Sequence, residues 1–387
     1  MTAPQRTCRD LGIRIGSLQP GPNDAITDVA GVRVGHTTLI SGEGPLVVGR
    51  GPVRTGVTVI VPHDGEIGQE PLFAGCHRLN GNGELTGLEW VRESGMLMSP
   101  IAITNTHSVG TVRDALIGYQ VKQRPDGPIF WSLPVVGETW DGSLNDINGF
   151  HVQAEHVERA LSQASDGPVA QGSVGGGTGM ICHDFKGGIG TASRVLNDED
   201  GAYTVGVLVQ ANHGRRHRLA INGVPVGARI GLDLVPEPGV PGPGRNEPGT
   251  SSIIIVVATD APLLPHQCDR LAQRAGLGVA RTGGVGEHSS GDLFFCFSVA
   301  NRGMPPSKRV AGVRLTSTVE VLSDLRITPL FDAVIEATEE SIVNALLAAE
   351  TMVGRDGVTA HGLEADRLLA VLSSARAGTG VDGESVS

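Results

Sequence analysis

Short apolar runs alternate with glycine-rich turns over the first half of the chain. Their length and β-branched composition are typical of buried strands. Between them, apolar residues recur at three- and four-residue spacing, which predicts helices. The predicted strands lie at 32–39, 57–61, 101–105, 133–136 and 203–209, and the predicted helices near 85–94, 111–121 and 153–164. This alternation predicts a mixed α/β fold.

The pattern breaks at residues 236–250, PEPGVPGPGRNEPGT, which are mostly proline and glycine. Such a segment forms neither helix nor sheet, so we predict an exposed linker. Directly after it, residues 252–258 place six apolar residues behind one serine, which is the most strand-like run in the chain. The linker therefore meets a buried strand at one point.

Helix dominates the pattern of the C-terminal third. Residues 265–275 predict a helix with proline in its first turn, and residues 293–300 predict another buried strand. A shorter helix is expected near 363–375, and the tail after it should fray. One face of a long amphipathic helix is predicted from Phe331, Val334, Ile335, Ile342, Ala345, Leu346, Ala349 and Val353.

Composition narrows the function classes. A net charge of −11 argues against nucleic acid or an anionic membrane as the main partner. No apolar run reaches the length of a membrane helix, and the N-terminus lacks the pattern of a signal peptide, so a cytoplasmic location is expected. The five cysteines are an odd number without a CxxC pair, which favours reduced thiols over disulfides or structural zinc.

Several familiar catalytic motifs do not fit. The glycine cluster at 175–179 has neither the GxGxxG spacing nor the lysine of a phosphate-binding loop. The chain also contains no HExxH and no GxSxG. These observations argue against a nucleotide site, a zinc protease and an α/β-hydrolase.

A hydroxyl cluster remains where the linker meets the strand: Thr250, Ser251 and Ser252. A hydroxyl that begins a strand could attack the carbonyl before it, and cleavage would then leave that residue with a free α-amine. Such an amine has a pKa of roughly 7.7–8.0, which suits a general base at neutral pH. One residue would supply both nucleophile and base. The alternative is that these are ordinary turn and strand-start residues.

Eight segments in unbroken order resemble the self-processing aminopeptidases typified by the L-aminopeptidase D-Ala-esterase/amidase (DmpA). That family includes the β-aminopeptidases, and nylon-oligomer hydrolases are relatives. The resemblance implies an αββα sandwich of the N-terminal-nucleophile-hydrolase type, one domain over 1–387, and a homo-oligomer, expected to be a tetramer. It implies no metal or cofactor. The segments are GPNDAITDVAGVRVGH (21–36), GPVRTGVT (51–58), LNGNGELTG (79–87), ITNTHSVG (103–110), SLNDINGFHV (143–152), GSVGGGTGMICHDFKGG (172–188), SIIIVVATDAPLLPHQ (252–267) and SGD (290–292).

The same resemblance implies that Ser252 is the nucleophile and that cleavage falls between Ser251 and Ser252, giving chains 1–251 and 252–387. The family usually has glycine or asparagine before the cut, so Ser251 is a departure, and Thr250 or Ser251 stays open as the first residue. Ser290 and Asp292 match a relay beside the nucleophile. Asn212 matches an oxyanion donor. From the residues alone, Asn212 fits a turn and Asp292 a surface cap.

Four further positions concern the substrate and the surroundings of the site. Glu138 matches a glutamate that can hold the free amino group of a substrate. Trp140 stands where a tyrosine is common, and an indole donates a hydrogen bond but accepts none, although it could equally be a packing aromatic. Lys186 is either an electrostatic group of the site or a loop charge. His107 is expected to be structural, because the terminal amine already supplies the base.

The sequence thus predicts a self-cleaving serine aminopeptidase or amidase. It would release the first residue of short peptides, amino-acid amides or esters, of α or β type, through an acyl-enzyme on Ser252. Two alternatives remain open. An amide-oligomer hydrolase or acyltransferase would use the same nucleophile, and acyl-transfer rates would distinguish it. A non-catalytic small-molecule-binding protein on the same scaffold would not cleave itself.

Overall fold

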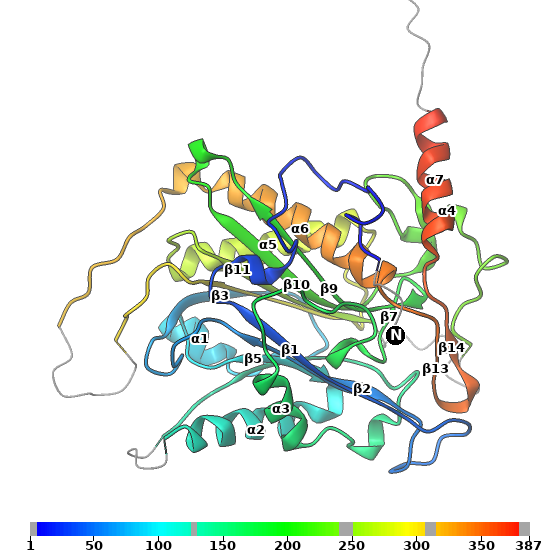
Figure 1. The fold of residues 1–387 in the computed structure, drawn as a ribbon, viewed down its shortest axis with the longest axis horizontal. Coiled ribbons are helices and arrows are strands. Elements are labelled where there is room, and N and C mark those ends of the chain that lie inside the picture. The colour runs from blue at the N-terminus through cyan, green and yellow to red at the C-terminus, as the bar shows by residue number, and fades with distance from the viewer. Residues whose placement is uncertain (1–5, 125–129, 240–250, 306–314, 379–387) are drawn as a thin grey trace, which may run out of the picture.

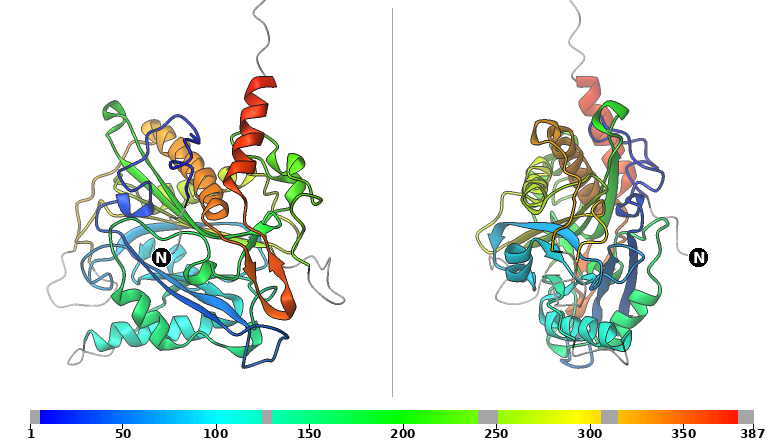
Figure 2. Two further views of the ribbon diagram at one scale, coloured as in Figure 1. Left: turned by 45° about the vertical axis from the view of Figure 1, so that its right-hand side comes forward. Right: turned by 90° about the vertical axis from the view of Figure 1, so that its left-hand side faces the viewer.

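The computed structural model describes residues 6–124, 130–239, 251–305 and 315–378. Two β-sheets pack face to face, and helices cover the outer face of each sheet (Figure 1). The turned views show the same order of layers (Figure 2). The αββα sandwich that the resemblance implied is therefore the architecture observed.

The larger sheet contains six strands from the described residues, in the order β4-β3-β12-β11-β10-β9. Strands β11 and β12 run parallel and every other neighbouring pair is antiparallel. Two helices cover its outer face: α5 (Pro265–Arg281) and α6 (Thr328–Leu347). The strands are β3 (Leu72–Gly81), β4 (Met96–Leu97), β9 (Gly188–Val195), β10 (Thr204–Asn212), β11 (Ser252–Thr259) and β12 (Gly291–Ser298).

Four strands from the described ranges form the smaller sheet, in the order β1-β2-β5-β6. Helices α2 (Val109–Lys122) and α3 (Ala154–Ser162) cover its outer face. Its strands are β1 (Arg33–Ser41), β2 (Val53–Val61), β5 (Ile101–Asn105) and β6 (Val135–Thr139). The shorter elements are α1 (Leu88–Ser94), α4 (Val226–Arg229), α7 (Ala365–Gly378) and the hairpins β7–β8 (Ile181–Cys182, Phe185–Lys186) and β13–β14 (Met352–Val353, Thr359–Ala360).

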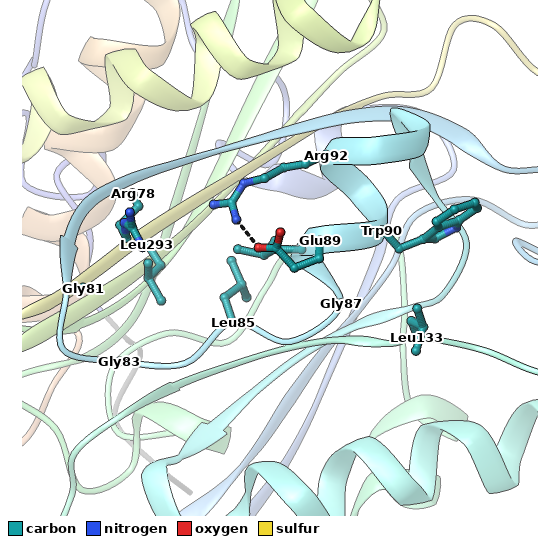
Figure 3. A pocket seen from close by; sticks show the side chains of 11 residues that line it. Arg78, Gly81, Gly83, Leu85, Gly87, Glu89, Trp90, Arg92, Leu133 and Leu293 are labelled. Carbon is teal, nitrogen blue, oxygen red and sulfur yellow. Dashed lines mark hydrogen bonds and ion pairs between the residues drawn. The ribbon is translucent and has the colours of Figure 1, made fainter.

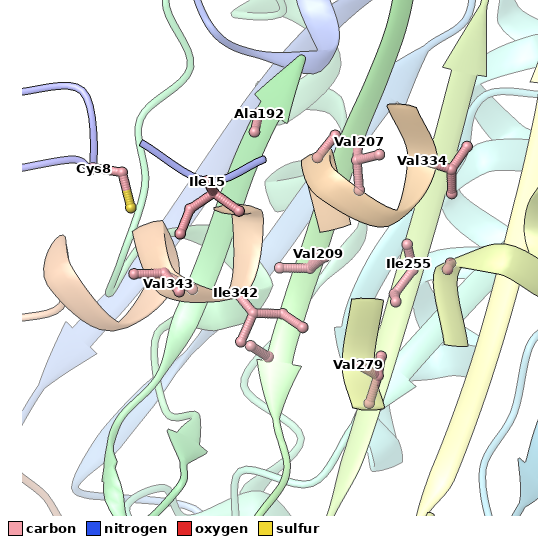
Figure 4. Packing of buried hydrophobic residues seen from close by; sticks show 14 of the residues in the cluster. Cys8, Ile15, Ala192, Val207, Val209, Ile255, Val279, Val334, Ile342 and Val343 are labelled. Atoms are coloured by element: carbon pink, nitrogen blue, oxygen red, sulfur yellow. The ribbon is translucent and has the colours of Figure 1, made fainter. Parts of the chain in front are cut away.

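Strand β11 is buried on both faces, as its continuous apolar run predicted. Ile253 and Ile255 join the core under the helices, whereas Ile254 and Val256 join the core between the two sheets. Alternate residues of a strand point to opposite faces, so one run of β-branched residues serves two cores. Figure 4 shows Ile255 near the helices that cover this sheet.

The predicted long amphipathic helix corresponds to α6, and it differs from the prediction in its end and in its burial. Helix α6 ends at Leu347, and Val353 lies in β13. From Glu336 to Leu347 every residue of the helix is buried, its three glutamates included. Arg194 of β9 makes this possible, because its buried guanidinium lies 3.1 Å from Glu336 and 2.5 Å from Glu340. Buried charges persist only when they are paired in this way.

Three strands of the larger sheet, β3, β9 and the two-residue β4, were not predicted. Strand β9 reads GIGTASRV, with few large apolar residues. Its small residues let α6 approach, because a Cβ on Gly190 would lie 1.8 Å from the Ser341 carbonyl oxygen. The close contact that stabilises this strand thus removes the apolar pattern by which strands are recognised.

Boundaries shifted by a few residues elsewhere. The helix predicted at 85–94 begins at Leu88, and the strand predicted at 293–300 begins at Gly291. Of the predicted linker, residues 236–239 lie largely at the surface, and 240–250 fall outside the described residues. Within the described ranges, no helix combines the length and apolar character needed to span a membrane.

We expect the substitution Ile254→Ala to lower the free energy of unfolding by about 2–5 kcal/mol, because it leaves a cavity between the two sheets. Ile40→Ala is the matched control, since the Ile40 side chain is 55% exposed. That change should stay within about 0.5 kcal/mol. Denaturant unfolding measures both, and equal effects would contradict the two-sided burial of β11.

Candidate active site

Ser252 begins β11 at the end of the larger sheet where the ends of three strands lie side by side. Asn212, the last residue of β10, is its antiparallel partner, and Gly291, the first residue of β12, is its parallel partner. Ser252 shares the alternation of Ile254, so its side chain faces the interior between the sheets. It is 4% exposed. The predicted nucleophile and the predicted oxyanion donor are therefore cross-strand neighbours.

The orientation of Asn212 is set by the hairpin β7–β8. Its side-chain oxygen accepts a hydrogen bond of 2.8 Å from the backbone N–H of Ile181. This leaves the amide NH₂ as the donor end of the side chain. An amide donor held in this way suits the stabilisation of a developing oxyanion.

Ser290 and Asp292 lie together beside the start of β11. The Ser290 hydroxyl donates a 2.6 Å hydrogen bond to Asp292 Oδ1, and its oxygen lies 3.2 Å from Ser251 Oγ. Asp292 is buried, so it is not the surface cap that the residues alone suggested. Burial raises its pKa to about 6, although the hydrogen bond from Ser290 opposes that shift. A buried carboxyl of this kind can hold or release a proton near neutral pH.

Glu138 lies in β6 of the smaller sheet, and its side chain lies near the same strand ends. Its carboxylate accepts hydrogen bonds from the Thr106 hydroxyl and, at 2.9 Å, from the Glu84 backbone N–H. Burial raises its pKa, and these two hydrogen bonds oppose the shift. Only Gly83 separates it from β12, since a Cβ there would lie 3.0 Å from Glu138 Oε1 and 3.1 Å from the Gly291 Cα. The Glu138 carboxylate thus lies across Gly83 from Gly291, the β12 partner of Ser252.

Trp140 and His107 pack against each other near Glu138. Their ring centroids are 6.0 Å apart in an edge-to-face arrangement, and Phe150 stacks on the other side of His107 at 6.0 Å. Trp140 also lines a cavity with Asn212 and Ser251. Its indole therefore both packs and faces the cavity, so the two interpretations of Trp140 do not exclude each other.

Lys186 is fully buried and lies among backbone carbonyls rather than carboxylates. Its Nζ donates to the carbonyl oxygens of Gly187 at 2.7 Å, Met180 at 2.9 Å and Gly177 at 3.4 Å. Burial lowers its pKa to about 7. The side chain ties the glycine segment to the hairpin that positions Asn212, so it is not a loop charge.

The cavity beside Ser251 measures about 50 Å³. Three charged residues that the sequence analysis did not single out line it: Asp184, Arg215 and Glu287. Arg215 Nε lies 3.3 Å from Glu287, which also pairs with Arg218 at 2.7 Å. Proximity to Asn212 in sequence was the available signal for Arg215, whereas Glu287 joins the site only through the turn before Ser290.

A larger cavity of about 400 Å³ lies beyond Gly83 (Figure 3). Leu85, Leu133 and Leu293 form its apolar wall, and the ion pair of Glu89 and Arg92 lies at its rim. None of the residues predicted to act in catalysis lines it. The smaller cavity is lined by Asn212, by Ser251, which directly precedes Ser252, and by ionisable groups, and it is therefore the candidate active site.

Residues 24–360 match the model of the peptidase family S58. The chain belongs to this family. A β-peptidyl aminopeptidase BapA of Sphingosinicella microcystinivorans is 48% identical over 95% of this chain and 92% of its own length. The predicted serine-type aminopeptidase is thus confirmed at the level of the family.

Solved structures of similar proteins agree with the fold. A β-aminopeptidase of a Burkholderia species has a TM-score of 0.88 and 52% identity, over 95% of this chain and 99% of its own. An L-aminopeptidase D-Ala-esterase/amidase of Ochrobactrum anthropi, described as a variant of the Ntn-hydrolase fold, has a TM-score of 0.84 and 42% identity, over 97% and 99%. The predicted family and fold class are confirmed.

Replacing the buried lysine, Lys186→Met, should lower the free energy of unfolding by about 1–3 kcal/mol, because backbone carbonyls lose their donor. The unfolded lysine binds a proton up to about pH 10, whereas burial in the folded state lowers the pKa to about 7. Wild-type stability should therefore rise between pH 7 and 10, and the difference from the variant should widen. Lys122→Met, at an exposed lysine, is the control in denaturant unfolding. A pH-independent difference would contradict this account.

Proposed function

We propose that this S58 enzyme cleaves itself before Ser252 and then acts as an aminopeptidase on short substrates with a free amino end, β-amino acids included. The observation that supports this best is the strand register, which places Ser252 between Asn212 and Gly291. The Ser252 hydroxyl, the Asn212 amide and the Ser290–Asp292 pair therefore all lie near the same strand ends of the larger sheet.

The proposed maturation is an acyl shift within one peptide unit. Ser252 Oγ attacks the carbonyl carbon of Ser251, the C–N bond breaks, and the acyl group passes to Oγ as an ester while the nitrogen takes the proton. Water then hydrolyses the ester and frees the carboxylate of residue 251. The products are chains 1–251 and 252–387, and Ser252 gains a free α-amine.

In the mature enzyme, the Ser252 α-amine takes the proton from its own Oγ as that oxygen attacks the substrate carbonyl. Asn212 donates to the oxyanion, a contribution of about 3–4 kcal/mol in comparable enzymes. The amine returns the proton to the leaving group, and water hydrolyses the acyl-enzyme. Ser290 and Asp292 orient the amine, and no metal or cofactor takes part in these steps.

Glu138 limits the substrates to those with a free amino group. Its buried carboxylate lies across Gly83 from the Ser252 strand end, where it can pair with an ammonium. A β-amino acid carries one more carbon between amine and carbonyl, and the relative from Sphingosinicella is named for β-peptides. Trp140 forms the wall of the site in place of a tyrosine.

Assembly and location are further parts of the proposal. A homotetramer follows from the family resemblance, and light scattering of the purified protein tests it. A cytoplasmic location is supported by the five cysteines, each of which lies in the described ranges and is free and buried. Each subunit of the tetramer is then a single domain over residues 1–387, made of both chains.

Purified wild-type protein should give two bands on a denaturing gel, of about 26 and 14 kDa in proportion to the total of 40.1 kDa. Ser252→Ala should leave one band, because it removes the attacking oxygen. N-terminal sequencing of the smaller chain should begin at Ser252; a start at Ser251 or at Thr250 would move the nucleophile. Ser251→Ala is the matched control and should still cleave.

The mature protein should hydrolyse β-alanyl and α-alanyl p-nitroanilides, and Ser252→Ala should lose this activity by at least about 10⁴-fold. An N-acetylated substrate should not be hydrolysed, because it has no ammonium for Glu138. Two bands without hydrolysis would disprove the aminopeptidase, and hydrolysis by an uncut chain would disprove the self-processing mechanism.

Self-cleavage should depend on pH through Asp292. Its pKa is raised to about 6, so the carboxylate is present above that pH and is protonated below it. Loss of the acceptor for Ser290 should slow cleavage by about tenfold per pH unit below 6. A gel time course of freshly synthesised chain measures this. Asp292→Asn should be slow at every pH, whereas Asp366→Asn, at an exposed aspartate, should keep the wild-type profile.

A further inference from the structure

Three side chains of the types that bind metal ions lie together beside the candidate active site. Cys182 ends β7, His183 follows it in the hairpin turn, and His213 follows Asn212. All three are buried, and one donor atom of each lies within 4.8 Å of the other two. Cys182 Sγ is 3.8 Å from His213 Nδ1. This cluster takes no part in the mechanism proposed above.

Both imidazoles have a buried nitrogen without a hydrogen-bond partner among the described residues, the Nε2 of His183 and that of His213. Such atoms are rare in folded proteins and often mark the place of a water or an ion. The Nδ1 of His183 lies 3.2 Å from the Arg215 carbonyl oxygen. A proton on Nδ1 makes that bond and leaves the lone pair on Nε2, as in histidines that bind metals.

Contacts from Arg216 hold the turn that carries His183. His183 and Asp184 have φ values of 49° and 59°, which non-glycine residues seldom adopt. The Arg216 guanidinium donates to the carbonyl oxygens of both, at 3.2 Å and 2.6 Å, and lies 3.5 Å from the centre of the Phe185 ring. These are the φ values of the tight two-residue turn that joins β7 to β8, and Arg216 fixes both carbonyl oxygens of that turn.

We propose that Cys182, His183 and His213 bind one Zn²⁺ or a similar borderline-soft divalent ion, with water as the fourth ligand. One thiolate and two imidazoles suit this class of ion. Metal–ligand bonds of roughly 2.0–2.3 Å place donor atoms about 3.5 Å apart, so the cluster must contract by about 1 Å. His213 lines the cavity of the active site, which gives the ion and its water a route inward.

The ion exchanges with a proton. The thiol S–H bond breaks, the proton leaves to solvent, and the sulfur keeps the electron pair that it shares with the metal. The bound ion and thiolate together carry a charge of +1. Two carboxylates of the same cavity, Asp184 and Glu287, lie close enough to favour a cation, whereas Lys186 and Arg216 oppose it.

Contraction of the cluster acts on Asn212, and this consequence rests on the proposed function. His213 is its neighbour in sequence, and Ile181, which holds the Asn212 side-chain oxygen, is the neighbour of Cys182. An ion that draws His213 and Cys182 together displaces both supports of the oxyanion donor. Zn²⁺ at this site therefore inhibits the enzyme.

The test uses full-length protein stripped of metal with a chelator and titrated with Co²⁺. One Co²⁺ per chain should bind, with the visible spectrum of a tetrahedral site and a sulfur-to-cobalt charge-transfer band, and Zn²⁺ should displace it. Cys182→Ser should lose the band. Cys268→Ser, at a buried cysteine of α5, should keep it, and His183→Gln should weaken binding by at least about 10-fold.

Absence of the band in the wild type, or its survival in Cys182→Ser, would overturn the site. If circular dichroism shows that Cys182→Ser does not fold, His183→Gln decides, and unchanged affinity there overturns the proposal. Zn²⁺ should lower kcat of the wild type and of Cys268→Ser but not of Cys182→Ser; equal inhibition of all three would overturn the regulatory role. The spectrum needs no catalysis, so failure of the proposed aminopeptidase would be seen separately.

Discussion

The pairing of β11 with β10 on one side and with β12 on the other is the constraint on which the site depends. Ile253 and Ile254 face different cores, so a slip of one residue would exchange the two sets of buried side chains. The register is therefore strongly specified by burial. Because Ser252, Asn212 and Gly291 stand at fixed places in that register, the packing of the core also sets the geometry of the candidate active site.

Around the candidate active site, the backbones of neighbouring segments pack closely because several positions are glycine. Gly83 lies between Glu138 and β12, and a Cβ on Gly291 would lie 2.4 Å from the Asn82 carbonyl oxygen. Lys186 holds the glycine segment that precedes it, because its Nζ donates to the Gly177 carbonyl oxygen. The high glycine content of the chain thus has a function at the site, since it lets two sheets bring their polar groups together.

Patterns that depend on one element were predictable, and those that depend on two were not. The apolar run of β11 predicts a buried strand. Strand β9 has no such run, because its glycines allow α6 to pack closely, and this contact is seen only in the structure. Ser290 and Asp292 could be placed on one face from their spacing, but their contact with Ser251 required the parallel pairing of β11 with β12. Glutamates on a helix usually indicate a face exposed to solvent, but Glu336 and Glu340 of α6 are buried because Arg194 pairs with them. Arg215 could have been suspected from its place near Asn212, whereas Glu287 could not have been found, since only the folded chain brings it to Arg215.

The strand order of the larger sheet has a consequence for a chain cut before Ser252. Strand β11 would then have an upstream neighbour, β10, and a downstream neighbour, β12, while β12 in turn pairs with upstream β3. The two polypeptides would be interleaved within one sheet, and neither could leave without unzipping several ladders of hydrogen bonds. Cleavage before Ser252 would leave the hydrogen bonds between these strands intact. The two chains would therefore stay together after the backbone is cut.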